Sequence, residues 1–186
     1  METPNPTVNP SSIVDILTLR YDTSIQPNLP KKSWEDFVPI NKPPNISSIE
    51  NSICGEIEST LESYNSKDAS IALSGGVDST LVLSLLRKTN PDPKINAVSI
   101  KFANSVDETP AAAKIAERFE AEHHVIELGN YLSELPKAIS IIKLPFWDLH
   151  WYYVVKKAKT LSKTIISGDG GDELFGGYTF RYKKFL

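Results

Sequence analysis

The chain has 186 residues, 40% of them hydrophobic and 23% charged, with a formal net charge of -3, which fits one ordinary domain plus an extra segment. The mild acidity argues against a nucleic-acid partner, and a single cysteine, Cys54, excludes an internal disulfide and a paired-cysteine metal site. No apolar run approaches the roughly 20 residues of a membrane span and no signal-peptide pattern opens the chain, so we expect a cytoplasmic protein.

Residues 1–45 hold most of the thirteen prolines, a composition that predicts an irregular arm. One short helix is expected inside this arm, from Ser11 or Ser12 to about Arg20. Apolar side chains farther along indicate that the arm docks on this domain or on another chain: Trp34, Phe37, Val38 and Ile40.

The second segment, residues 46–186, is expected to form an ordered domain that opens with a long amphipathic helix ending near Asn65. Ser47 and Glu50 match a capping box at its start. Apolar residues then recur at helical spacing: Ile46, Ile49, Ile53, Ile57, Leu61 and Tyr64. Cys54 lies within this pattern and is predicted to be a core residue, not a nucleophile.

Strands and helices alternate after this first helix. Strands are predicted at 69–73, 95–102, 123–128 and 164–167, and helices at 79–88, 107–120, 131–142 and 148–161. The helix at 79–88 is apolar nearly all round and is expected to be deeply buried. This order predicts an α/β fold with a parallel sheet covered by helices on both faces, in which ligands bind beyond the carboxyl ends of the strands.

Two of these strands run directly into loops rich in glycine and acidic residues. The first loop reads Ser74-Gly75-Gly76-Val77-Asp78-Ser79-Thr80. Gly75 and Gly76 allow backbone N–H groups to approach an anion, and the following helix start adds its positive dipole end. Ser74 and Ser79 can donate hydrogen bonds to phosphate oxygens. Asp78 is expected to hold a magnesium ion, because a bare carboxylate repels phosphate.

The pattern S-G-G-x-D-S after a strand resembles the PP-loop of ATP pyrophosphatases, and it lacks the lysine of a Walker A loop. The resemblance implies an adenine nucleotide α-hydrolase-like, HUP-type fold that grips the pyrophosphate end of ATP, with Mg²⁺, and cleaves at the α-phosphate. GMP synthetase, NAD synthetase, argininosuccinate synthetase and tRNA-thiolating enzymes are similar at this loop. The alternative is an ordinary strand–turn–helix connection with incidental glycines.

The second loop runs Ser167-Gly168-Asp169-Gly170-Gly171-Asp172-Glu173-Leu174-Phe175-Gly176-Gly177-Tyr178. Three carboxylates this close repel one another unless a cation lies nearby, and a magnesium ion shared with Asp78 is a sufficient reason for the cluster. A solvated acidic turn is the alternative. The two loops are expected to meet across one crevice at the carboxyl edge of the sheet.

This string closely resembles the segment S-G-[ED]-G-x-D-E-x-F-G-G-Y of asparagine synthetases and the related β-lactam synthetases. The resemblance covers residues 45–182. It implies that Asp172 joins Asp78 in binding magnesium, and that Asp169 is a catalytic residue at a position where the family often has glutamate and also has aspartate. It also implies that Ser167 and Gly168 lie near the nucleotide.

Weaker similarity to the same family continues elsewhere, in the segments Phe102, Asp107-Glu108, Ala112, Ile115-Ala116-Glu117, His123-His124 and Pro145-Phe146-Trp147-Asp148. Asp107 is expected either to reach the pyrophosphate–magnesium region as a catalytic residue or to cap a helix. By the resemblance, Leu73 and Ile100 contact adenine, with core packing as the alternative reading. The paired histidines are expected to be structural.

The resemblance implies a ligase that cleaves ATP to AMP and pyrophosphate to adenylate a carboxylate, aspartate by family default, which ammonia or an amine then attacks. No cysteine follows Met1 and no region of glutaminase size is present, so either the sequence is a fragment of a longer protein or a separate glutaminase or C-terminal partner chain is expected. Two alternatives stay open. One is a non-catalytic ATP-binding or partner-docking module derived from this family, and the other is another PP-loop enzyme, such as one that modifies tRNA.

Overall fold

A computed structural model describes residues 9–19, 22–24, 45–65, 68–103, 105–142, 149–175 and 177. Within the arm it contains one helix, α1 (Pro10–Leu19), where a short helix is predicted. The predicted docking residues near Trp34 and the segment 145–148 lie outside the described residues. No helix of the described part is both long and apolar enough to cross a membrane.

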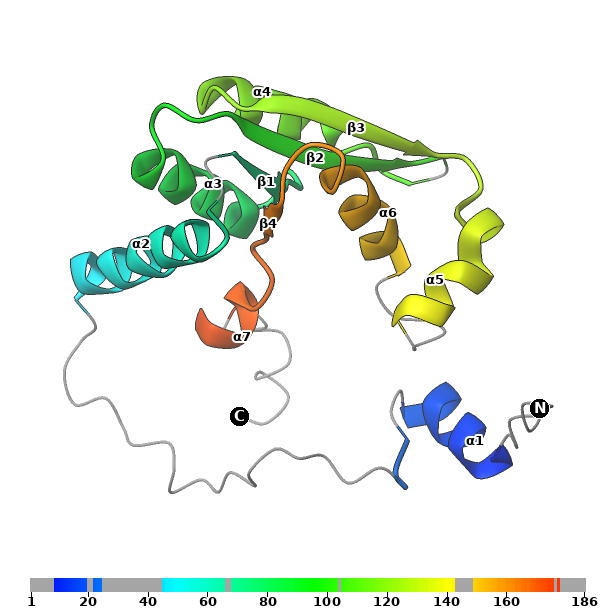
Figure 1. Ribbon diagram of the computed structural model, residues 1–186. Helices are drawn as coiled ribbons and strands as arrows, with labels where there is room; N and C mark the ends of the chain where they lie inside the picture. Colours follow the sequence, from blue (N-terminus) through cyan, green and yellow to red (C-terminus); the bar gives the residue numbers. More distant parts are fainter. Residues whose placement is uncertain are drawn as a thin grey trace, which may run out of the picture.

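Four strands form one parallel sheet in the order β3-β2-β1-β4 (Figure 1). They are β1 (Ala69–Ala72), β2 (Ile95–Phe102), β3 (Glu122–Leu128) and β4 (Thr164–Ile166). β1 lies in the middle, with Ala69 in register with both Ile95 and Thr164. Most residues of β1 and β2 are buried, including the polar Ser70, Asn96 and Ser99, as expected for strands of a sheet covered on both faces. The predicted α/β class is therefore confirmed.

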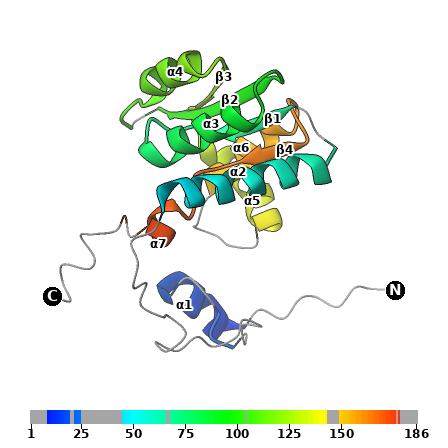
Figure 2. The ribbon, with the colours of Figure 1, turned by 90° about the vertical axis from the view of Figure 1, so that its left-hand side faces the viewer.

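Helices cover both faces of the sheet, and their packing forms two separate hydrophobic core clusters (Figures 1 and 2). On one face lie α2 (Ile46–Ser63), α3 (Val77–Thr89) and α4 (Thr109–Arg118), which pack around Ile71 and Ile95. On the other face lie α5 (Leu135–Ile142) and α6 (Leu149–Ala158), which pack around Ile100 and Ile126. Cys54 packs at the border of the first cluster, in agreement with its predicted core role.

Several helix predictions need correction. The cap of α2 is Asn45, whose side chain accepts from Ser47 N, and Glu50 pairs with Lys88 instead of closing a capping box. Helix α3 is not buried all round, because Leu81 is 47% exposed and faces away from the sheet-packed residues.

The helix predicted at 131–142 is two elements. A single 3₁₀ turn, η2 (Tyr131–Glu134), precedes α5. Pro136 explains the break, because it has no N–H to donate to the carbonyl of Leu132 and its ring excludes that carbonyl. Conversely, part of the second glycine loop is helical, as the short α7 (Gly171–Phe175).

Candidate functional site

The two glycine loops lie side by side because β1 and β4 are parallel neighbours whose carboxyl ends share one edge of the sheet. The first loop joins β1 to α3, and the second joins β4 to α7. A cavity of about 320 Å³ lies between the two loops. The end of β2 and the first turns of α4 and α6 form the rest of its wall. The sequence-based expectation that both loops border one crevice is met.

Gly168 makes the closest approach between the loops. A Cβ atom at Gly168 would lie 2.8 Å from the backbone nitrogen of Ser79 and 2.9 Å from the carbonyl carbon of Asp78. A Cβ atom at Gly171 would lie 3.0 Å from Cγ of Asp78. Only glycine fits such contacts with backbone, so the second loop rests directly on the first turn of α3.

The first loop is braced by its own hydroxyl groups. The Ser79 hydroxyl is buried and lies 3.0 Å from the Ser74 hydroxyl, and it accepts a hydrogen bond from Ser74 N at 3.2 Å. Gly76 N donates to the Ser74 hydroxyl at 3.1 Å. These bonds hold the loop open in front of the α3 N-terminus, whose N–H groups and dipole favour an anion. Ser74 and Ser79 both line the cavity.

Two of the three predicted acidic residues reach the cavity. Asp78 and Asp169 line it and are exposed, whereas Asp172 does not line it and its carboxylate lies against Gly177. Among the described residues no three His, Cys, Asp or Glu side chains form a complete metal site. Two carboxylates beside a phosphate-binding loop nevertheless suit magnesium, which takes its other ligands from phosphate and water.

Asp107 and Glu108 occupy different positions at the start of α4. The Asp107 carboxylate accepts hydrogen bonds from the Thr109 hydroxyl (2.6 Å) and Thr109 N (3.0 Å) and lies 3.1 Å from the Lys101 ammonium. These contacts, the Thr109 hydroxyl first, lower the pKa of Asp107. Glu108, in contrast, lines the cavity beside Gly75. The sequence singled out Asp107 and did not indicate a role for Glu108.

The remaining cavity wall is mostly apolar. Leu73 is buried and Ile100 half-buried, and both line the cavity as the resemblance implied for an adenine contact. Phe102 from β2, which the sequence marked only as a point of family similarity, also lines the cavity. So do three residues of α6 that the sequence did not single out: His150, Trp151 and Val154. The spacing i, i+1, i+4 puts the three α6 residues within an arc of about 100° on one side of the helix, but no local motif marks that side as facing a site.

The paired histidines do not line the cavity but connect β3 to β2. His123 Nε2 lies 2.9 Å from the Ser99 hydroxyl, and His124 Nε2 lies 3.1 Å from Oδ1 of Asn96. Burial lowers the pKa of both imidazoles. Their partners are thus side chains of the neighbouring strand, which agrees with a structural role.

Comparison with solved structures defines the class of fold. An NH3-dependent NAD synthetase from Campylobacter jejuni superposes with a TM-score of 0.55 at 21% identity, covering 73% of this chain and 62% of that one. A glutamine-dependent NAD⁺ synthetase from Acinetobacter baumannii gives a TM-score of 0.55 at 16% identity, over 75% of this chain and 29% of that one. With its parallel sheet and glycine loop, the domain has the PP-loop, HUP-type fold.

Sequence comparison then defines the family. The Asparagine synthase family model matches residues 65–186, so the chain belongs to the asparagine synthase family. A putative glutamine-hydrolyzing asparagine synthetase 2 of Methanocaldococcus jannaschii is 34% identical over 111 residues, 57% of this chain and 22% of that protein. Asparagine synthetase 1 of Bacillus subtilis is 34% identical over the same length, 17% of that protein. The chain therefore spans about a fifth of these relatives.

Proposed function

We propose that this chain binds Mg–ATP in the cavity between the two glycine loops and takes part in the ATP-dependent amidation of a carboxylate. ATP is cleaved to AMP and pyrophosphate, the carboxylate becomes an acyl-adenylate, and ammonia or an amine displaces AMP. The contact of Gly168 with Ser79 N and Asp78 carries the proposal, because it joins an anion-binding helix start to an acidic loop. The names of the relatives, asparagine synthetases, support aspartate as the carboxylate.

In this proposal the pyrophosphate part of ATP binds at the first loop. The backbone N–H groups of Gly75 and Gly76 and the hydroxyls of Ser74 and Ser79 would face its oxygens, aided by the α3 dipole. The adenine ring would lie on the apolar wall that includes Leu73 and Ile100.

Near the α-phosphate, the backbone of Ser167 and Gly168 would run alongside the nucleotide. Asp78 and Asp172 would hold a magnesium ion, which neutralises charge on the departing pyrophosphate when bound. Asp169 lines the same cavity, and its carboxylate would accept the proton that the attacking amine releases as the amide forms.

Ammonia requires a source outside the residues described. We propose that a separate glutaminase or C-terminal partner chain supplies the ammonia and completes the acid-binding part; the names of the relatives, glutamine-hydrolyzing asparagine synthetases, support glutamine as the source. A cytoplasmic location, where ATP is abundant, is part of the same proposal.

The test is pyrophosphate release from Mg–ATP with aspartate and ammonia present and then absent. We expect Asp78→Ala to lower release at least 100-fold, because the departing pyrophosphate loses its metal. Asp92→Ala, which removes an exposed aspartate from the turn before β2, is the matched control and should leave release unchanged.

Three outcomes separate the candidates. Aspartate-dependent release supports an acid-activating synthetase. ATP binding by calorimetry without release, even with a C-terminal partner region added, supports a non-catalytic nucleotide-binding module. Release by Asp78→Ala at the native rate would falsify the assignment of the loop.

A further inference from the structure

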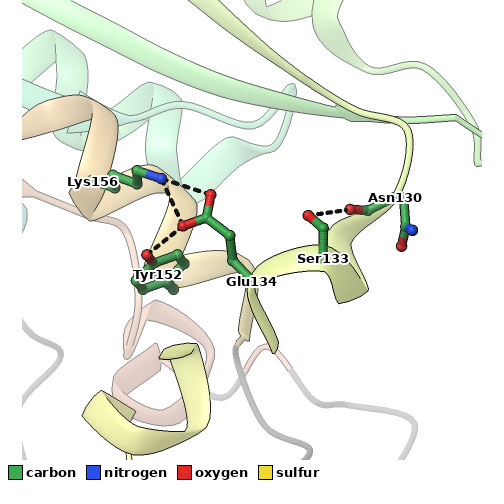
Figure 3. Close-up of polar contacts among 5 residues, drawn as sticks. All are labelled: Asn130, Ser133, Glu134, Tyr152 and Lys156. Carbon is green, nitrogen blue, oxygen red and sulfur yellow. Dashed lines mark hydrogen bonds and ion pairs between the residues drawn. The ribbon is translucent and has the colours of Figure 1, made fainter. Parts of the chain in front are cut away.

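A polar cluster outside the cavity joins α6 to the turn after β3 (Figure 3). The Glu134 carboxylate accepts a hydrogen bond from the Tyr152 hydroxyl at 2.7 Å and lies 2.6 and 2.7 Å from the Lys156 ammonium. The ammonium also lies 5.6 Å from the centre of the Tyr152 ring, within range of a cation–π contact. These three residues are named the α6 clamp below.

The Glu134 end of the clamp is tied to the sheet. Glu134 is the last residue of η2, which follows β3 after only two residues. The Asn130 side chain accepts from Leu132 N at 3.1 Å, and the Asn130 carbonyl accepts from the Ser133 hydroxyl at 3.0 Å, as Figure 3 shows for the second bond. The turn is thus capped by its own residues, and Glu134 holds α6 at a defined distance from the end of β3.

The other end of the clamp is on the helix that supplies one wall of the cavity. Tyr152 and Lys156 lie one turn apart on α6 and share a face. His150, Trp151 and Val154 of the same helix line the cavity. At 3.6 residues per turn, Val154 points roughly 160° away from Tyr152, so clamp and cavity use different faces of one helix.

Apolar packing is non-directional, so it constrains the rotation of α6 less sharply than bonds with a fixed geometry do. Tyr152 is 8% exposed and packs with Ala138 and Tyr153 in the second core cluster. The clamp bonds are directional and charge-assisted, which makes them the stronger constraint on register. His150 and Trp151 lie in the first turn of α6, where helix ends fray unless held.

We propose that Glu134 is a positioning residue for the nucleotide cavity: through Tyr152 and Lys156 it sets the rotation of α6, and so the wall formed by His150, Trp151 and Val154, without touching the nucleotide. This inference rests on the proposed function for the identity of the ligand. In the proposed function, the α6 wall faces the adenine end of ATP and not the pyrophosphate end. A loss of the clamp should therefore weaken binding of ATP more than binding of pyrophosphate, which a general loss of folding would not do.

The experiment compares two probes, ATP and inorganic pyrophosphate, by calorimetry in the presence of magnesium. We expect Glu134→Ala to raise the Kd for ATP about tenfold, the size of effect that a small displacement of a site wall produces, and to change the Kd for pyrophosphate less than about twofold. Glu134→Gln keeps one acceptor oxygen and should give an intermediate Kd for ATP. Tyr152→Phe keeps the ring and should resemble Glu134→Gln.

Glu50→Gln is the matched control. Its ion pair with Lys88 also joins two elements at 2.6 Å and is exposed to a similar extent, with side chains 38% and 59% exposed against 33% and 53% for Glu134 and Lys156. It should leave both Kd values unchanged. Equal weakening of ATP and pyrophosphate by Glu134→Ala, or no weakening of either, would overturn the proposal.

If the native chain binds neither ATP nor pyrophosphate, the proposed function is wrong, but the role of the α6 clamp can still be tested by a second measurement. In a Trp34→Phe, Trp147→Phe background, Trp151 is the single tryptophan. Acrylamide quenching of its fluorescence should increase about twofold with Glu134→Ala and not with Glu50→Gln. Unchanged quenching would show that Glu134 does not set the wall.

Discussion

At the residue scale, Asp107 and Glu108 show how neighbours in sequence take different positions. The Asp107 carboxylate is occupied by Thr109 and Lys101, whereas Glu108 lines the cavity next to the first glycine loop. A carboxylate already used to start a helix and to pair with a lysine is poorly placed to serve a substrate. The N-cap residue of α4 is Glu108, so Asp107 is not the helix cap that the sequence allowed; its contacts with Thr109 and Lys101 favour a structural role just before the helix over the catalytic one.

We therefore expect Asp107→Asn to change pyrophosphate release less than about threefold, since the asparagine oxygen can still accept from Thr109. Glu108→Gln should lower release about tenfold, because a charge in the cavity is lost. Steady-state rates with Mg–ATP, with circular dichroism to verify folding, decide the matter. A collapse of activity in Asp107→Asn alone would restore Asp107 as a catalytic residue.

Asp107 and Glu108 also show which features of the site could be predicted from the sequence and which could not. The meeting of the two glycine loops could be predicted, because parallel strand ends share one edge of the sheet and close backbone approach demands glycine. The choice between Asp107 and Glu108 could not, since it depends on where α4 begins. The sequence pattern allowed a start at Asp107, and the helix starts at Thr109.

At the element scale, Arg87 joins the ends of two helices. Its guanidinium donates to five backbone carbonyls: those of Asn90, Pro91 and Pro93 after α3, and those of Phe119 and Glu120 after α4. Carbonyls at helix C-termini lack intrahelical donors and carry the negative dipole end, so a planar fork of N–H groups suits them.

Arg87→Ala should lower the free energy of unfolding by about 2 kcal/mol, within the range for hydrogen bonds to charged groups. Arg87→Lys should recover less than half of this loss, because an ammonium cannot span both helix ends. Urea denaturation followed by circular dichroism measures both changes. Lys88→Gln, which removes only the exposed ion pair with Glu50, is the control and should be neutral; a lysine variant as stable as the native chain would refute the fork argument.

Elements that depend on distant contacts were harder to predict than strands. The four strands could be predicted because buried parallel strands are short apolar runs bounded by turns. The exposure of Leu81 and the role of α6 could not, since both depend on which neighbours cover each helix face. Likewise, the two-part η2–α5 element required the effect of Pro136 to be weighed against strong helical spacing.

At the scale of the whole molecule, the two histidines make stability depend on pH. Burial, the largest cause for both, lowers the pKa of His123 and His124 in the folded chain. For His123 the charge of His124 acts in the same direction, whereas for His124 the neighbouring Glu122 opposes the shift and Lys157 and Lys94 add to it. The unfolded chain therefore binds protons more readily than the folded one just below the ordinary histidine pKa of about 6.5.

Because of this difference in proton binding, the neutral histidines stabilise the folded chain at high pH and not at low pH. Their contribution to the free energy of unfolding is present above about pH 6.5 and is lost as the pH falls through the lowered pKa values of the folded chain. Asp107, Glu122 and Glu134 have lowered pKa values too, through bonds to Thr109, Lys94 and Lys156, so their contribution is lost only at more acidic pH, below about 4. The pH ranges of the histidines and of the carboxylates are therefore separate.

We expect Tm to fall by about 2–4 °C between pH 7.5 and 5.5, measured by scanning calorimetry, and to fall again below about pH 4. Replacing both histidines with glutamine should flatten the first step and leave the second. A first step that survives this double substitution would show that other groups produce it.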